Sequence, residues 1–478
     1  MTTFYLLLPV LFIVIFNLPF GKWMRSAAPW LAAGLILFQT VTSVTGLPAG
    51  WAAGLATVDG WLKFSAAVPD QFGQVMMFSV GVVSAAALAV GYSLFADEPK
   101  RFSFLNLLLI SKTAMTGIIL SQDLFSVYVF LEITSIASFV LISLNKDKAG
   151  LSGAYNYIVL SALATVFLLG SIGFLFLLTG GTGFADVANA VTASPHRLTA
   201  SIALGFLVIG LFIKGGIVPF HGWLPDAYAN SPAAVSVLLA GIVTKVSGLY
   251  TLIRLVALTS GLPAGLKEIL LAVGALSVTV AAVIAVTQTN FKRVLAWSSI
   301  SQIGYIVLGF ATGSALGIAG AVFHILNHSL FKSLLFVNAA AVEKRAGTLE
   351  LASLGGLQSK MPVTSSTSLV AALSTAGVPP LAGFWSKLLI IMALWQSHQH
   401  IYALIAILAS VLTLAYLLII QARVFWGKLK ESFTAVTEAG PLITVTSVVL
   451  ALLNIGVGLG FPFVFDRFFK PIKDILFR

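Results

Sequence analysis

Five lysines and one glutamate lie inside long apolar segments of this 478-residue chain, where a charge is costly. A charge at the centre of a bilayer costs about 2.5–3.5 kcal/mol on insertion scales. Removal from water lowers the pKa of a lysine, and a nearby carboxylate raises it again. A Glu–Lys pair of adjustable separation can therefore take up and release a proton near neutral pH. The side chains concerned are Glu132, Lys112, Lys214, Lys245, Lys332 and Lys387.

For each of these groups the alternative is a structural ion pair or a lysine that extends to the membrane surface. Four of them lie well inside their segments, which favours a function there: Glu132, Lys214, Lys245 and Lys387. Lys112 and Lys332 lie nearer the ends of their predicted helices, so for these two both interpretations stand.

Two histidines extend this set. His324 and His328 are four residues apart and share one helix face, and Lys332 continues the same stripe. Histidine titrates near neutral pH without help from its surroundings. The stripe therefore favours a proton relay over buried histidines of the core.

Helix-breaking residues interrupt two of the apolar segments, beside Lys214 and Lys387. Proline removes a backbone donor, and unpaired backbone at membrane depth requires protein or water to satisfy it. Paired interruptions in the two halves of a chain indicate a transport site more than a simple packing kink. The residues that interrupt the helices are Gly215, Pro219, Pro379 and Pro380.

The composition places the chain in a membrane. It is 59% hydrophobic and 9% charged, whereas soluble domains carry about 25% charged residues. This excludes soluble-enzyme and nucleic-acid-binding classes and makes the lipid bilayer a partner. Cysteine is absent, which excludes disulfides, thiolate metal sites and cysteine-ligated iron–sulfur clusters. We expect no metal and no cofactor in this chain, so any redox chemistry belongs to a partner.

The predicted fold class is an all-α polytopic membrane protein. An odd offset of five spans separates the broken seventh and twelfth spans, which predicts inverted repeats of spans four to eight and nine to thirteen. The expected units are residues 1–98, 99–258, 259–430 and 431–478, the last containing a basic tail. Residues 47–74, with Trp51 and Trp61, are expected along a membrane interface. The fourteen predicted spans are 3–19, 27–46, 75–96, 102–120, 124–144, 153–179, 201–219, 232–257, 266–287, 293–311, 314–342, 364–396, 401–427 and 440–460.

The cations predict an orientation. The net charge is +11, and loops after odd-numbered spans hold most of the loop Lys and Arg. The positive-inside rule then places the N-terminus outside the cell membrane of a prokaryote. The tail disagrees, because its cations would lie on the outer side: Arg467, Lys470, Lys473 and Arg478.

Longer motifs identify a family. They are DLFSVYVFLEITSIASFVLI, IKGGIVPFHGWLPDAYANSPAAVSVLLAGIVTKVSGLY, FKRVLAWSSISQIGYI, HILNHSLFKSLLF and GVPPLAGFWSKLLI. The chain resembles the antiporter-like proton-pumping subunits of respiratory complex I, membrane-bound energy-converting hydrogenases and Mrp-type cation/proton antiporters. The resemblance covers nearly the whole chain and implies fourteen helices in two inverted five-helix half-channels.

The resemblance also implies roles for individual residues. A proton reaches Lys245 by way of Lys214, while Glu132 holds Lys214 charged until a neighbouring subunit separates them. The proton then crosses the two histidines to Lys387, and a lysine at that position resembles the Mrp D-type and hydrogenase members. The implied relay is Glu132, Lys214, Lys245, His324, His328 and Lys387, and the auxiliary candidates are Lys332, His221, Asp226 and Lys112.

The implied partners are other membrane subunits, with H⁺ as the transported ion and Na⁺ as a second candidate. The competing function is a stand-alone secondary transporter of a cation or solute, because broken helices occur there too. A redox subunit is disfavoured by the absence of cysteine and of a dinucleotide motif, and a structural spacer by the buried charges. Whether the parent complex is an Mrp antiporter, a hydrogenase or complex I stays open at this point.

Overall fold

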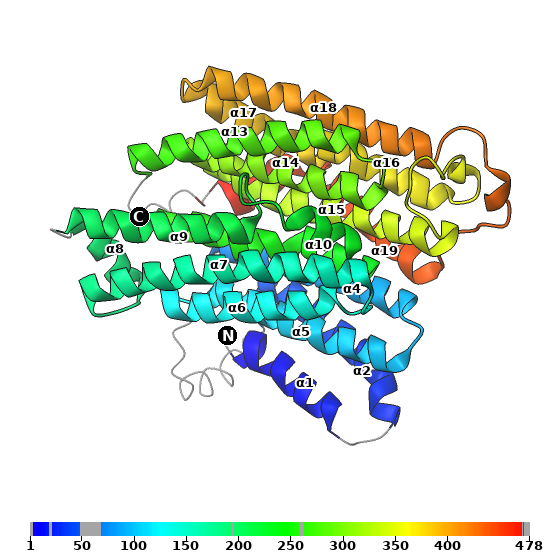
Figure 1. Ribbon diagram of the computed structural model, residues 1–478, viewed down its shortest axis with the longest axis horizontal. Helices are drawn as coiled ribbons and strands as arrows, with labels where there is room; N and C mark the ends of the chain where they lie inside the picture. Colours follow the sequence, from blue (N-terminus) through cyan, green and yellow to red (C-terminus); the bar gives the residue numbers. More distant parts are fainter. Residues whose placement is uncertain are drawn as a thin grey trace.

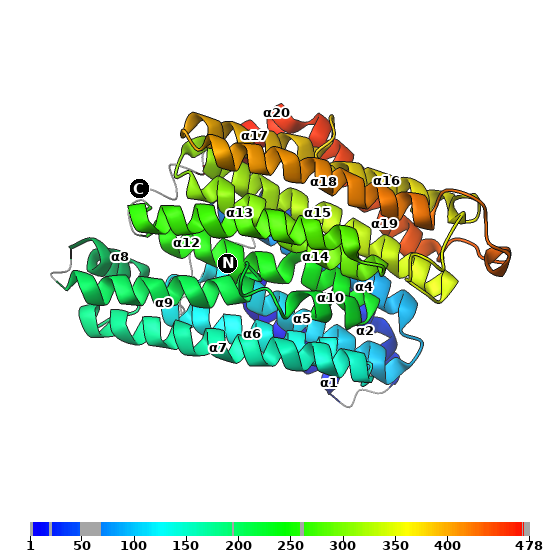
Figure 2. The same cartoon turned by 45° about the horizontal axis from the view of Figure 1, so that its top comes forward.

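The computed structural model is a bundle of long helices that run roughly side by side (Figure 1, Figure 2). It describes residues 3–18, 22–47, 68–193, 196–258, 262–470 and 472. The first half contains η1 (Thr3–Leu7), α1 (Leu8–Asn17), α2 (Lys22–Thr45), α4 (Gln71–Leu94), α5 (Glu98–Leu120), α6 (Leu124–Ile142), α7 (Lys148–Thr179), α8 (Phe184–Ala193), α9 (Arg197–Gly215), α10 (Leu224–Asn230), α11 (Ala233–Leu238), η2 (Leu239–Val243), η3 (Lys245–Tyr250) and α12 (Thr251–Ala257). The second half contains α13 (Ala264–Thr287), α14 (Phe291–Ala311), α15 (Ala315–Ala346), η4 (Leu357–Ser359), α16 (Pro362–Ala376), α17 (Ala382–Gln396), α18 (His400–Val424), η5 (Glu431–Phe433), α19 (Pro441–Leu459), α20 (Phe461–Val464) and η6 (Phe465–Phe469).

The prediction of an all-α polytopic protein is confirmed. Twelve helices of the described residues are long and apolar enough to cross a membrane. Two further apolar helices are shorter, Phe4–Asn17 and Ala382–Gln396, and they fall in the predicted first and twelfth spans. The twelfth span appears as two helices, α16 and α17, because the chain breaks between them.

The two predicted helix breaks are present. α9 ends at Gly215 and α16 ends at Ala376, and the next residue of each is a glycine with positive φ, 66° at Gly216 and 88° at Gly377. Glycine is the residue that adopts this left-handed conformation without steric cost. Gly216 therefore makes the turn that the sequence assigned to Gly215.

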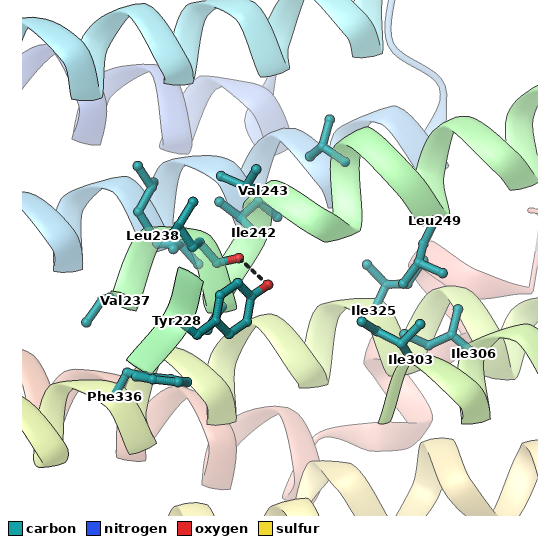
Figure 3. Close-up of a cluster of buried hydrophobic side chains, with 14 of the residues drawn as sticks. Tyr228, Val237, Leu238, Ile242, Val243, Leu249, Ile303, Ile306, Ile325 and Phe336 are labelled. Carbon is teal, nitrogen blue, oxygen red and sulfur yellow. Dashed lines mark hydrogen bonds between the residues drawn. The ribbon is translucent and has the colours of Figure 1, made fainter. Parts of the chain in front are cut away.

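The interior centres on α15 and the segment 233–257, both wholly enclosed by protein. Figure 3 shows Tyr228 of α10 among apolar side chains of the neighbouring elements, including Ile303 of α14 and Phe336 of α15. The hydroxyl of Tyr228 donates to the Leu239 carbonyl at 3.0 Å. α7 and α18 instead expose apolar faces, as helices at a lipid boundary do. The polar groups of the central elements are thus shielded from lipid.

Local landmarks recur in the two halves of the chain. Asp123 forms an isolated bridge with Gly183, and Asn290 forms one with Glu350, so that each partner lies 167 residues from its counterpart. α7 and α15 each have 32 residues and each ends at a left-handed glycine. These matches support an internal repeat, while its inverted symmetry stays a prediction.

Some segments differ from the sequence-based expectation or lie outside the described residues. α8 forms within a predicted loop, and the predicted straight span 232–257 contains the π-helical segments η2 and η3. Residues 48–67 of the expected interfacial segment, and Lys473 and Arg478 of the tail, lie outside the described residues. The tail begins as the short helices α20 and η6.

Candidate functional site

An ion pair joins α6 to the last turn of α9. Lys214 Nζ lies 3.0 Å from Glu132 Oε1; the lysine side chain is fully buried and the glutamate side chain is 24% exposed. Lys214 also donates to the hydroxyls of Ser135 at 2.8 Å and Ser161 at 2.7 Å. Thr165 donates to Glu132 Oε1 at 2.8 Å. The buried ammonium therefore has its three hydrogen-bond partners.

The break after α9 is held in place by an aromatic side chain. Trp223 Nε1 donates to the Ile213 carbonyl at 2.9 Å, and the same carbonyl accepts from the Gly216 N–H at 3.1 Å at the helix end. The Trp223 ring stacks on Tyr157 at 4.1 Å. This fixes the position of the turn next to Lys214.

Lys245 lies at the start of η3 and is fully buried. Its ammonium donates to the carbonyl of Ala240, five residues earlier. π-Helical turns change the register of backbone carbonyls and occur often at functional sites. The irregular helix thus supplies a backbone acceptor to a lysine that forms no ion pair among the described residues.

His324 and His328 lie on α15 with ring centroids 6.3 Å apart. His324 Nδ1 is 2.8 Å from Ser386 Oγ, and Nε2 is 3.2 Å from Gln302 Oε1. Both ring nitrogens of His328 are buried without a protein hydrogen-bond partner. The two histidines of the stripe therefore differ: His324 is held by two neighbouring side chains, and His328 is not.

Lys332 continues this stripe, and its prediction near a helix end is wrong. It lies in the middle of α15, fully buried, and donates to Ser298 Oγ at 2.7 Å and the Leu295 carbonyl at 3.1 Å. Tyr416 donates to the same Ser298 hydroxyl at 2.9 Å. The sequence underestimated its depth because α15 extends to Ala346, beyond the predicted end at residue 342.

Lys112 is likewise buried, and α5 ends at Leu120, where the sequence predicted its end. Its ammonium donates to Gln39 Oε1 of α2. It does not extend to a membrane surface.

In the second half, Lys387 has neutral partners. Its ammonium donates to the Ala376 carbonyl at the end of α16 and to Ser410 Oγ, both at 3.3 Å. It also lies 4.4 Å from the centroid of the Tyr305 ring. The Tyr305 hydroxyl is 2.9 Å from Ser410 Oγ and donates to Ala406 at 2.5 Å. A helix C-terminus and an aromatic face both stabilise a cation.

The six predicted relay residues differ in what the structure places beside them. Glu132 and Lys214 form an ion pair in the first half. His324 and His328 lie together on α15, and Ser386 links His324 to α17, the helix that carries Lys387. Lys245 lies on η3 with the Ala240 carbonyl as its partner.

The auxiliary candidates His221 and Asp226 lie beyond the first break. Asp226 is 3.0 Å from Arg293 of α14 and accepts from Asn156 of α7 at 3.2 Å. The His221 ring is 5.3 Å from that of Trp297. The contacts of Asp226 therefore join α10 to α14 and to α7, close to α9, the helix that carries Lys214.

The sequence did not identify the neutral side chains that complete the site. Ser, Thr and Tyr are common in these helices, and most of the serine and threonine hydroxyls donate to their own helix. A hydroxyl within an apolar segment can be recognised in the sequence as a candidate partner of a buried charge. Which hydroxyl lies beside a charged side chain depends on how the helices pack. Those that meet the relay include Ser135, Ser161, Thr165, Tyr305, Ser386 and Ser410.

Comparison with known proteins gives one consistent result. Residues 121–413 match the family described as NADH:quinone oxidoreductase/Mrp antiporter, TM. The D-type component of the Na⁺/H⁺ antiporter of Alkalihalophilus pseudofirmus is 31% identical, over 76% of this chain and 74% of that protein. The N-type component of the NADH-quinone oxidoreductase of Desulforudis audaxviator is 35% identical, over 70% and 67%. A chain of the membrane-bound sulfane sulfur reductase, an archaeal respiratory membrane complex, superimposes with a TM-score of 0.87 at 25% identity, covering 100% of this chain and 98% of that one.

Proposed function

The chain belongs to the NADH:quinone oxidoreductase/Mrp antiporter family, and on that premise we propose that it translocates protons as one subunit of a multisubunit membrane complex. The observation that carries the proposal is the ion pair between Glu132 and Lys214 beside a broken helix. An isolated buried ammonium is unstable without a counter-charge, and one whose counter-charge can move is a proton donor.

The proposed path starts at this pair. Glu132 holds Lys214 protonated, and separation of the two favours release of the proton toward Lys245. The packing of α9 on η3 supports this step, because a Cβ added to Gly248 would lie 2.2 Å from Gly215 Cα. The two helices approach so closely there that little protein separates the lysines.

From Lys245 the proton crosses the stripe on α15 to Lys387. His328, whose ring nitrogens have no protein partner, accepts and passes the proton through water, and His324 continues through Ser386 of α17, the helix that holds Lys387. Lys387 releases it on the far side. We propose that Lys332 binds a proton beside this path without lying on it. We assign His221 and Asp226 to the side at which the proton is taken up.

The parent complex supplies the driving force in this proposal. Because the sequence leads us to expect no cofactor in this chain, we propose that either electron transfer in partner subunits or exchange with Na⁺ drives transport. The names of the relatives support both alternatives, since one belongs to a Na⁺/H⁺ antiporter and the other to an NADH-quinone oxidoreductase. The site of action is the cell membrane of a prokaryote, with the N-terminus outside.

Transport by the assembled complex in proteoliposomes tests the pair. Glu132→Gln and Lys214→Met are each expected to lower proton transport at least about tenfold, since loss of one partner of a buried pair costs about 3–5 kcal/mol. The matched controls are Glu431→Gln and Lys428→Met, which change exposed side chains and leave transport unchanged. Wild-type transport by either pair variant at normal membrane levels would overturn the assigned role.

A further inference from the structure

Lys112 is a buried lysine that the proposed relay does not use. Its side chain lies between α5 and α2, and the oxygen within hydrogen-bond distance of its ammonium is Gln39 Oε1. Among the described residues it forms no ion pair. A permanent charge there would be costly, and an apolar side chain would pack at no such cost.

A small cavity adjoins the ammonium. It has a volume of about 10 Å³, which is roughly the space of one water molecule. α2 and α4 approach closely at this level, because a Cβ on Gly81 would lie 1.9 Å from Thr40 Oγ1. The cavity is lined by Tyr5, Gln39, Thr40, Met77, Gly81, Lys112 and Thr116.

From this cavity hydroxyl side chains continue along α2 to its end at Thr45, on more than one face of the helix, and Thr40, Thr42, Ser43 and Thr45 are together called the hydroxyl row. Thr40, Thr42 and Ser43 are buried, and each hydroxyl donates to a carbonyl of α2 itself. Their oxygen lone pairs are therefore free to accept a hydrogen bond, and Thr42 Oγ1 accepts one from Tyr5 at 3.1 Å. Thr45 is exposed. A structural clamp between α2 and α5 would need Gln39 alone and gives no reason for this row.

The neighbouring elements leave Lys112 electrically isolated. η1 contributes Tyr5 as its titratable group, α1 contributes none, and the part of α2 and α4 beside the cavity contributes none. Of the other elements packed on α5, α6 carries Tyr128 and Glu132, and Glu132 is paired with Lys214. η3 carries Lys245, which donates to the Ala240 carbonyl, and Tyr250, whose hydroxyl donates to the Ile119 carbonyl of α5.

The other charges near this end of the helices are Asp70 and Arg254. Asp70, just before α4, accepts from Arg254 at 2.7 and 2.8 Å. Burial alone would raise the pKa of Asp70, but the hydrogen bonds and charge of Arg254 outweigh burial and hold that pKa below its usual value. Asp70 therefore remains an anion at neutral pH, and the charge of Arg254 balances it.

We propose that Lys112 is a further proton-binding site, which exchanges its proton with the membrane surface at the Thr45 end of α2 and acts independently of the Glu132–Lys214 pair. Its amine takes up one proton to become an ammonium bonded to Gln39 and returns it along the hydroxyl row. The site makes transport respond to pH on that surface. The opposite surface lies at the end of α5 that carries Lys100.

The test measures proton transport by the intact complex in proteoliposomes while pH is varied on one side at a time. Because transport is the measured quantity, this inference rests on the proposed function. The wild-type rate is expected to change with pH on the Thr45 side, and Lys112→Met should reduce that response at least threefold. Lys100→Met, the same substitution on the same helix, should retain the full response. An unchanged response in Lys112→Met would overturn the site but leave the proposed function, which the Glu132 variant tests separately.

A second variant keeps the test decisive if Lys112→Met does not assemble. Gln39→Glu preserves the shape of the partner and places a carboxylate beside the ammonium. The added carboxylate should hold the proton on Lys112 more tightly. The pH at which the transport rate lies half-way between its two limits should therefore rise by at least one unit. A midpoint identical to the wild type would overturn the proposal.

Discussion

The two halves of this protein hold their lysines in different ways. In the first half Lys214 faces the carboxylate of Glu132, whose side chain is 24% exposed. In the second half Lys387 is surrounded by the Ala376 carbonyl, the Ser410 hydroxyl and the Tyr305 ring. The first lysine therefore has an ionised partner, and the second has only neutral ones.

We propose that this difference separates a group that controls when the proton moves, in the first half, from a group that releases it, in the second. A full counter-charge holds a proton on an amine more strongly than a carbonyl, a hydroxyl and an aromatic ring do. Because Glu132 reaches the surface of α6, a neighbouring molecule can alter it, whereas Lys387 is enclosed. We expect the first half to set when a proton moves and the second half to let it go.

The largest effect is expected from giving the second half a carboxylate. Ser410→Asp would place an anion next to Lys387, and charges about 4 Å apart attract by about 4 kcal/mol at an effective dielectric constant of 20. The proton would be held and transport should fall at least about thirtyfold. Ser410→Asn, equal in shape but neutral, is the control in the same proteoliposome assay. Equal transport rates for Ser410→Asp and Ser410→Asn would show that the absence of a negative charge beside Lys387 is unimportant for transport.

The glycines at the two breaks give the next largest effect. Gly216→Ala and Gly377→Ala each cost about 1–2 kcal/mol of left-handed strain, and both should lower the temperature of thermal unfolding. The new Cβ at Gly377 would lie 3.0 Å from Lys387 Cδ, whereas that at Gly216 would meet Leu224. Transport per assembled complex should therefore fall about tenfold only in Gly377→Ala. An equal loss in both variants would mean that strain alone is responsible.

Removal of the aromatic face in the second half should have a smaller effect. Tyr305→Leu abolishes a cation–π contact worth about 0.5–2 kcal/mol, and we expect an approximately fivefold change in transport rate. Tyr305→Phe keeps the ring and removes the hydroxyl, so it should remain closer to the wild type. If both variants change the rate equally, the hydroxyl bonded to Ser410 is the important group.

The smallest effect is expected in the first half at Thr165. Thr165→Val removes a hydrogen bond to a partly exposed Glu132, a contribution of about 0.5–1 kcal/mol, and should change the transport rate about threefold. Thr446→Val, on α19 and bonded to its own helix, is the matched substitution in the second half and should have no effect beyond the assay error. If Thr165→Val changed the transport rate more than Glu132→Gln does, the role proposed for the Glu132–Lys214 pair would be contradicted.

Much of the site was predictable because charge inside an apolar segment is costly and therefore conspicuous. The charges of Lys214, Lys245 and Lys387 stand out for this reason, and the prolines near positions 219 and 379 marked the breaks. The depth of Lys112 and Lys332 was not predictable, since it depends on where a helix ends and on which helices enclose it. The π-helical backbone at Lys245 was also not predictable, because its composition, including Gly241 and Gly248, does not distinguish it from the other helices of this chain.

The sequence by itself determined the membrane setting, the order of the spans, the two interruptions and the residues able to carry a proton. These depend on composition and on spacing along one chain. The resemblance already implied that Glu132 acts on Lys214, and only the tertiary structure decided that Lys387 receives a ring and a carbonyl. That choice depends on how helices far apart in the sequence pack together, and the short-range forces between their side chains act only after packing has occurred.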